Sequence, residues 1–184
     1  MPSLAEPSPR YEVVYRKIRY PRLEFKTGTL LLILPEGASE EELLTKYASW
    51  IEEKSAIIEE ALQKSQDKEL YSRSDVGFKS LIYNLINDYS DDLGKKPAHV
   101  FFRRMNSKWA SCSKNGNITV NLILKYLPDQ AIAYVLYHEM VHLSERRHNA
   151  IFWKKISEKY PNWEDIEKDL FIYWFVVQRL VTGE

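Results

Sequence analysis

Three of the four histidines of this chain lie within one short stretch, HEMVHLSERRH, at positions 138–148. His138 and His142 are four residues apart, so on a helix their rings lie one turn apart on the same face and can reach one ion. Glu139 follows the first histidine and projects near the same site. This H-E-x-x-H spacing is typical of sites in which two histidines hold zinc and the glutamate handles the proton of a water molecule. The stretch therefore predicts a metal site for hydrolysis.

A catalytic zinc usually has three protein ligands and one water molecule. His148 is the natural third ligand, but on an unbroken helix it would lie about 240° around the axis from His142 and roughly 9 Å along it. The chain must therefore turn between Ser144 and Arg147. Asn149 supports such a turn, because asparagine is a preferred N-cap and the apolar-periodic AIFWKKI follows it. We favour His148, and the alternative third ligand is a glutamate of the later helices: Glu158, Glu164 or Glu167.

The N-terminal part of the chain has the pattern of strands followed by helices. Residues 11–34 alternate as strands do, with a hairpin turn expected at Lys26 to Gly28. Ser39 and Glu42 have the S-x-x-E spacing of a capping box, so a helix is expected to begin just after Ser39 and to continue, with one possible break, to about Ser65. Residues 66–77 are polar and unpatterned, which predicts a linker.

The remaining chain contains the elements that must position the histidines. An amphipathic helix is expected from Phe78 until Gly94 and Pro97 end it, and residues 98–104 are typical of a strand. Asn115-Gly116 lies between two short extended runs, which indicates a hairpin with both turn residues at positive φ. A helix then opens at Pro128 and carries the histidine stretch, and two further helical segments follow.

The overall composition excludes several classes of protein. The chain has 184 residues, 45% of them hydrophobic and 28% charged, which is ordinary for a globular protein. Acidic and basic residues balance at 26 each, which argues against a main role in binding nucleic acid or anionic membranes. A single cysteine, Cys112, excludes an internal disulfide and a cysteine-rich zinc finger. The N-terminus has no apolar core of a secretory signal, so we expect a soluble, reduced, cytoplasmic protein.

With these residues assembled, the chain resembles the YgjP-like zinc metallopeptidases, a zincin-fold family related to the SprT and WSS-type proteases. The similarity lies in KWASCSKNGNITVN (108–121), in YVLYHEMVHLSERRHNAIFW (134–153) and in the N-terminal LLLILPEGASEEEL followed by SWIEEK. Ala110 departs from the glycine usual in the family, and Asn149 departs from its usual serine. The resemblance implies an α+β, zincin-like fold, one Zn²⁺ per chain held by His138, His142 and His148, and Glu139 as the catalytic glutamate.

The resemblance also suggests where a peptide substrate binds. Zincins typically hold substrate as an extended strand along a sheet edge, and residues 117–121 are our candidate for that edge. The expected substrate-binding residues are Trp109, Asn117, Thr119 and Asn121. Cys112 is expected to be structural. Zincins often use a second group to stabilise the oxyanion, and the candidates left open are Arg103, Arg104 and Tyr173.

The hypothesis that follows is a zinc metallopeptidase in which Glu139 is the general base. We expect a tail at 1–10, an N-terminal β/helical subdomain at 11–65, the linker at 66–77 and a catalytic domain at 78–184. The expected partner is a peptide or protein, without a membrane and without nucleic acid as a main ligand. One alternative is a crosslink-repair protease of the SprT or WSS type that acts on proteins attached to DNA. The other is a non-catalytic, zinc-stapled binding module, which would not require Glu139.

Overall fold

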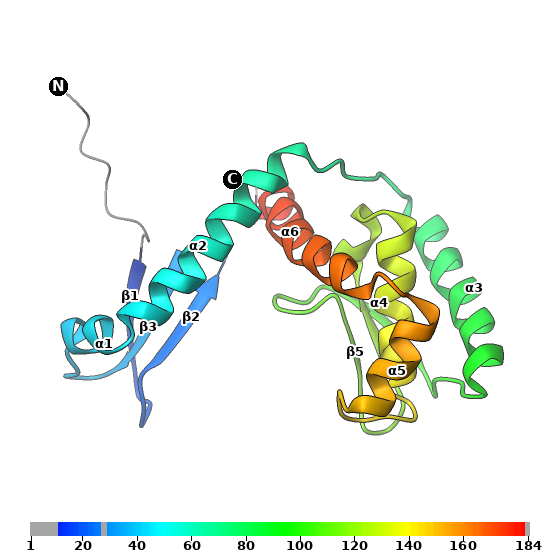
Figure 1. Ribbon diagram of the computed structural model, residues 1–184, viewed down its shortest axis with the longest axis horizontal. Helices are drawn as coiled ribbons and strands as arrows, with labels where there is room; N and C mark the ends of the chain where they lie inside the picture. Colours follow the sequence, from blue (N-terminus) through cyan, green and yellow to red (C-terminus); the bar gives the residue numbers. More distant parts are fainter. Residues whose placement is uncertain (1–10, 27–28, 183–184) are drawn as a thin grey trace. The chain divides into compact units, whose positions relative to one another are not determined.

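The computed structural model describes residues 11–26 and 29–182 (Figure 1). The chain divides into two compact units. The N-terminal unit comprises Met1–Lys68 and Trp174–Glu184, and the central unit comprises Glu69–Tyr173. Both units combine helices with a small sheet, so the expected α+β class is confirmed. The domain limits expected from the sequence stay a prediction.

The sheet of the N-terminal unit has its most apolar strand in the middle. β1 (Tyr11–Arg16) pairs in parallel with β3 (Thr29–Pro35), and β2 (Arg22–Lys26) pairs antiparallel with β3 on its other side. Leu32 and Leu34 of β3 are fully buried and pack with Leu43. The strands on both sides of the expected hairpin turn are therefore present, whereas Thr27 and Gly28 lie outside the described residues.

Two helices follow this sheet in the N-terminal unit. α1 (Glu40–Lys46) begins after Ser39, whose side-chain oxygen accepts a hydrogen bond from the backbone N–H of Glu42 at 3.4 Å. The helix start expected from the capping sequence is thereby confirmed. Tyr47 separates α1 from α2 (Ala48–Lys64), and the short 3₁₀ helix η1 (Ser65–Asp67) comes next. The expected break in the helical segment therefore falls at Tyr47.

The sheet of the central unit corrects one expectation. β4 (Val100–Arg103), β5 (Ala110–Cys112) and β6 (Ile118–Asn121) are ordered β4-β6-β5, with β4 parallel and β5 antiparallel to β6. Residues 117–121 were expected to form the sheet edge, but β6 is the middle strand and all of its residues are buried. The hairpin places β5 on one side of β6, and β4 occupies the other side. The edges of this sheet are therefore β4 and β5.

The turn between β5 and β6 lies one residue earlier than expected. The backbone N–H of Gly116 donates to the carbonyl oxygen of Ser113 at 3.0 Å, which centres the turn on Lys114 and Asn115 rather than on Asn115 and Gly116. Gly116 has a φ of +74°, a left-handed conformation that glycine adopts without steric cost. The turn is therefore a four-residue β-turn, Ser113 to Gly116, whose last residue is a left-handed glycine, and the expected hairpin is present.

Helices pack around this sheet in the central unit, and α4 (Asp129–Val141) contacts α3 (Asp75–Leu93), α5 (Ala150–Lys159) and β5. α4 is buried on most of its sides, since Tyr134, Leu136 and Met140 are all at most 1% exposed. α6 (Trp163–Thr182) follows α5, and residues 163–173 of it belong to the central unit. No helix among the described residues is long and apolar enough to cross a membrane. The expected cytoplasmic location stays a prediction.

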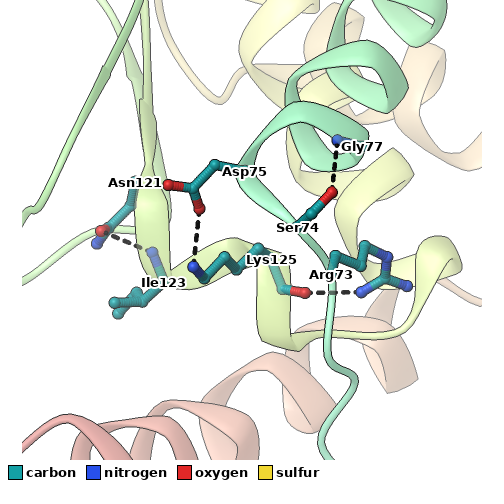
Figure 2. Close-up of polar contacts among 7 residues, drawn as sticks. All are labelled: Arg73, Ser74, Asp75, Gly77, Asn121, Ile123 and Lys125. Atoms are coloured by element: carbon teal, nitrogen blue, oxygen red, sulfur yellow. Dashed lines mark hydrogen bonds and ion pairs between the residues drawn. The ribbon is translucent and has the colours of Figure 1, made fainter.

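A network of polar contacts at the start of α3 holds the segment that leads into α4 (Figure 2). Arg73 donates to the carbonyl oxygens of Lys125 and Leu127, at 2.8 and 2.5 Å, and forms an ion pair with Asp129 in the first turn of α4. Lys125 in the 3₁₀ helix η2 (Leu122–Tyr126) pairs with Asp75 at 2.8 Å. The beginning of the histidine-bearing helix is thus tied to the beginning of α3.

Replacing Arg73 with methionine is expected to lower the free energy of unfolding by about 1–3 kcal/mol, because two carbonyl oxygens lose their charged donor. The measurement is the midpoint of urea unfolding, followed by tryptophan fluorescence. Lys168→Met removes an exposed ion pair with Asp165 on α6 and is the matched control, expected to change stability by less than about 0.5 kcal/mol. An unchanged midpoint for Arg73→Met would contradict the role given to this network.

Candidate active site

The three histidines of the sequence motif converge in the central unit. The Nε2 atom of His148 lies 3.0 Å from Nε2 of His138 and 3.1 Å from Nε2 of His142. Zinc held tetrahedrally at 2.0–2.1 Å would separate its ligand nitrogens by about 3.3 Å, so both of these spacings suit such an ion. Among the described residues, the potential metal ligands that cluster here are these three histidines. Glu158, Glu164 and Glu167, the alternative third ligands, are not part of the cluster.

The chain reversal that delivers His148 is built from hydrogen bonds, without a glycine. α4 ends at Val141, and His142 is its C-cap. The Nδ1 atom of His142 lies 2.9 Å from the carbonyl oxygen of Glu145; because a carbonyl can only accept, Nδ1 carries the proton and the lone pair of Nε2 is directed at the other histidines. Asn149 then caps α5 by accepting the backbone N–H of Phe152 at 2.9 Å. The expected turn and cap are both present.

The same loop also holds the β5–β6 hairpin. The guanidinium of Arg146 donates to the carbonyl oxygens of Ser113 and Lys114, at 2.6 and 2.7 Å. The residues between His142 and His148 therefore do two things at once. They reverse the chain toward the third histidine, and they fasten the hairpin that contains β5 beside the histidine rings.

Aromatic side chains of α5 form one wall of the histidine cluster. Phe152 is fully buried and stacks on His142, with ring centroids 4.7 Å apart. It also meets His138 and His148 edge-on, at 4.9 and 4.6 Å, and Trp153 lies 5.6 Å from His148. Close packing on rings of fixed position limits how far the imidazoles can rotate. The geometry of the three nitrogens is therefore held before any ion binds.

The pKa values of two histidines are lowered by their surroundings. Burial first, and then the neighbouring His142 and His148, lower the pKa of His138 to about 3. Burial also lowers the pKa of His142, although the carbonyl of Glu145 acts in the opposite direction. Neutral imidazoles are the form that binds a metal cation. At neutral pH these two rings are therefore in the correct protonation state for a metal site.

A carboxylate and a phenol lie on the Nδ1 side of His138, away from the other two histidines. The hydroxyl of Tyr134 donates to Oε1 of Glu167 at 2.6 Å, and the same oxygen lies 3.8 Å from Nδ1 of His138. That distance is longer than a hydrogen bond but short enough for electrostatic attraction. Glu167 on α6 thus faces the outer nitrogen of His138 while Nε2 faces the cluster. Carboxylates in this position orient metal-bound histidines and raise their basicity.

Glu139 lies beside the histidines in a pocket of about 380 Å³. Burial raises its pKa to about 7, and this effect is opposed by the backbone N–H of Cys112 and by the charge of Lys108. The pocket is lined by β5 and the residues before it, by α4, by His148 and by α6. Besides the histidines and Glu139, its lining residues include Lys108, Trp109, Ala110, Ser111, Cys112 and Tyr134. The carboxylate therefore lies between the histidine cluster and an edge strand.

Of the four expected substrate-binding residues, only Trp109 lines this pocket. Asn121 is fully buried, and its amide donates to the carbonyl oxygens of Met105 and Lys108 at 2.8 and 2.7 Å. Thr119 is 9% exposed on the middle strand. Asn117 lies at the turn, where its backbone N–H donates to Ser113. The placement of Asn121 and Thr119 speaks against contact with substrate, because their strand is covered on both sides.

Sequence reasoning missed the lining role of Lys108, Ser111 and Tyr134, since nothing in their spacing separates a pocket wall from an ordinary strand or helix. The open oxyanion candidates Arg103, Arg104 and Tyr173 are not among the described residues that line the pocket. Cys112 does line it, and burial followed by the charge of Glu139 raises the pKa of its thiol. A protonated thiol is a weak nucleophile.

Replacing Glu167 with alanine is expected to weaken zinc binding by about 10- to 100-fold, because His138 loses the carboxylate that orients it. Tyr134→Phe should weaken it less, since it leaves the carboxylate in place. The measurement is competition for Zn²⁺ with a chelator of known affinity. Glu164→Ala, an exposed carboxylate on the same helix, is the matched control and should bind zinc as the unchanged protein does. Unaltered affinity in Glu167→Ala would remove Glu167 from the site.

Known proteins that are similar to this chain are metallopeptidases. The family model described as "YgjP-like, metallopeptidase domain" matches residues 77–172. Among solved structures, the chain is similar to the metallopeptidase zymogen abylysin of Pyrococcus abyssi, with 26% identity and a TM-score of 0.45 over 48% of this chain and 90% of that one. It is also similar to the zymogen jannalysin of Methanocaldococcus jannaschii, with 18% identity and a TM-score of 0.44 over 55% and 91% of the two chains. No curated protein matches. Because the family model covers more than half of the chain, this protein belongs to the YgjP-like metallopeptidase family, as its sequence resemblance predicted.

Proposed function

We propose that this chain is a zinc-dependent peptidase in which His138, His142 and His148 hold one Zn²⁺ and Glu139 is the general base. The observation that carries the proposal is the convergence of three histidine Nε2 atoms beside a half-buried glutamate, in a pocket bounded by an edge strand. A structural zinc site has no need of such a glutamate or of an open pocket. The arrangement therefore favours catalysis over a non-catalytic, zinc-stapled module.

The chemistry divides between the ion and the protein. A zinc ion held by the three histidines would supply a Lewis acid that polarises the scissile carbonyl and lowers the pKa of a water molecule. Glu139 accepts a proton from the attacking water and returns it to the leaving amine. Burial, which raises the pKa of its carboxyl to about 7, makes Glu139 a stronger base than an exposed glutamate. The backbone N–H of Cys112 orients this carboxylate from the neighbouring strand.

The free edge of β5 supports binding of an extended peptide. The backbone groups of Trp109 and Ser113 are directed at β6, as the bonds from Asn121 to Trp109 and from Ser113 to Asn117 show. In an antiparallel pair the intervening residues alternate in direction, so the N–H and C=O of Ala110 face away from β6. A peptide can therefore add to this edge as a further strand, with its carbonyl groups passing Glu139. This moves the proposed substrate strand from β6 to β5.

Glu139→Gln is expected to retain one zinc per chain and to lose peptidase activity by about 10²- to 10⁴-fold, since the amide has similar shape but cannot accept the proton. The measurements are elemental analysis of the purified protein and turnover of a quenched fluorescent peptide library. Full activity in this variant would disprove the assignment of Glu139 as the base.

His148→Ala is expected to lose bound zinc, because two histidines alone form an incomplete site. His99→Ala is the matched control: His99 is the fourth histidine of the chain, is exposed, and should be replaceable with no effect on zinc content. The measurement is zinc per chain after gentle desalting. Retained zinc in His148→Ala would point to a glutamate as third ligand, and zinc lost equally in His99→Ala would mean that both changes act through the fold.

A further inference from the structure

The charges of the chain balance as a whole but not along its length. Residues 93–128 contain no aspartate or glutamate, although this segment forms the entire sheet of the central unit. Its basic residues are Lys95, Lys96, Arg103, Arg104, Lys108, Lys114 and Lys125. Lys125 is paired with Asp75, and the other six are exposed. The sheet that lies beside the proposed catalytic centre is therefore positively charged in a protein with zero formal net charge.

Cations lie at both ends of β5. Lys108 precedes the strand and lines the pocket, and its backbone is held because its carbonyl accepts the buried amide of Asn121 at 2.7 Å. At the other end, Lys114 follows the strand, and Arg146 is fastened there through its bonds to the carbonyls of Ser113 and Lys114. The five residue-to-residue steps from position 108 to position 113 span about 17 Å of extended chain, so the two groups of charges flank a substrate segment of about six residues.

These cations have no direct carboxylate partner among the described residues. Within the described part of the chain, Lys108, Lys114 and Arg146 form no ion pair with a carboxylate, since the partners of Arg146 are uncharged carbonyl oxygens. The two pocket carboxylates make their direct contacts elsewhere, although the charge of Lys108 acts on Glu139 at longer range. Glu167 is bound by Tyr134 and faces His138, and Glu139 accepts the N–H of Cys112. The positive charges are therefore available to a bound ligand.

We propose that the preferred substrates of this enzyme are peptides with acidic side chains on both sides of the scissile bond, recognised by Lys108 at one end of β5 and by Lys114 and Arg146 at the other. This inference rests on the proposed peptidase function and narrows its substrate class. A strand added to β5 passes both groups of cations, and each exposed ion pair adds a small, salt-dependent preference. The spacing along one strand edge favours discrete acidic side chains of a peptide over nucleic acid, whose phosphates would require a continuous basic track.

The test compares quenched fluorescent peptides that differ only by aspartate and glutamate against asparagine and glutamine on each side of the cleaved bond. With the zinc-loaded protein, kcat/KM should be about fivefold higher for each acidic side, and the preference should fall as salt rises. Lys108→Glu should reverse the preference on one side only, and Lys114→Glu on the other. Lys154→Glu, at an exposed lysine of α5, is the control with the same charge change and should leave both preferences intact.

A binding measurement separates this inference from the proposed function. Zinc-loaded Glu139→Gln protein is titrated with the labelled acidic peptide and with its amide counterpart, followed by fluorescence anisotropy. Cleavage of peptides without any acidic preference would overturn the inference and leave the peptidase function in place. If the protein cleaves none of the peptides, tighter binding of the acidic peptide would still support the cation-flanked edge, and equal binding would overturn it. Tighter binding of single-stranded DNA than of the acidic peptide, at the same salt, would overturn it in favour of nucleic acid.

Discussion

The reversal of the chain between α4 and α5 is the constraint on which the proposed site depends. Two histidines one turn apart need only a helix, but the third can reach them only if the helix stops immediately and the chain returns. Val141 ends α4, the ring of His142 donates to the carbonyl of Glu145, and Asn149 opens the next helix. The hydrogen bond from His142 to Glu145 thus stabilises the turn and also sets the tautomer of a proposed ligand. Loss of the turn would therefore change both the position of His148 and the protonation pattern of the His142 ring.

The same loop, residues 142–149, connects the histidine rings to the sheet. Through Arg146 it fastens the hairpin turn that follows β5, and β5 in turn directs the backbone N–H of Cys112 at Glu139. The proposed base is therefore positioned from two sides, by its own helix and by the strand along which we place the substrate. A change in the loop would therefore move the histidines, the proposed base and the strand edge together.

The apolar surroundings of α4 give these polar groups their properties. Phe152 packs on the three imidazoles, and the helix around them is almost completely buried. Burial disfavours the charged forms of histidine and glutamate, so His138 stays neutral while the carboxyl of Glu139 becomes more basic. The sheet beside this apolar centre carries exposed cations, and our substrate inference rests on those at the two ends of β5.

Local patterns in the sequence determined much of this protein. The H-E-x-x-H spacing, the capping chemistry of Ser39 and Asn149 and the glycine of the β5–β6 hairpin each depend on residues within about one helical turn or one β-turn, where steric and hydrogen-bonding rules act without the rest of the chain. These features placed the histidine cluster, the helix starts and the family correctly. The fold class was implied by the resemblance that these motifs carry to the family.

Only the tertiary structure decided which strand is the edge. Residues 117–121 have an alternating pattern that suits either an edge or a middle strand, and β4, a parallel partner from further back in the chain, made β6 the middle. As a result Asn121, which was expected to contact substrate, is buried and its amide donates hydrogen bonds to the loop before β5. The support of His138 by Glu167 likewise joins residues of α4 and α6 that no local spacing relates. Contacts between distant segments depend on packing and on competition among possible partners, which the linear pattern of residues does not encode locally.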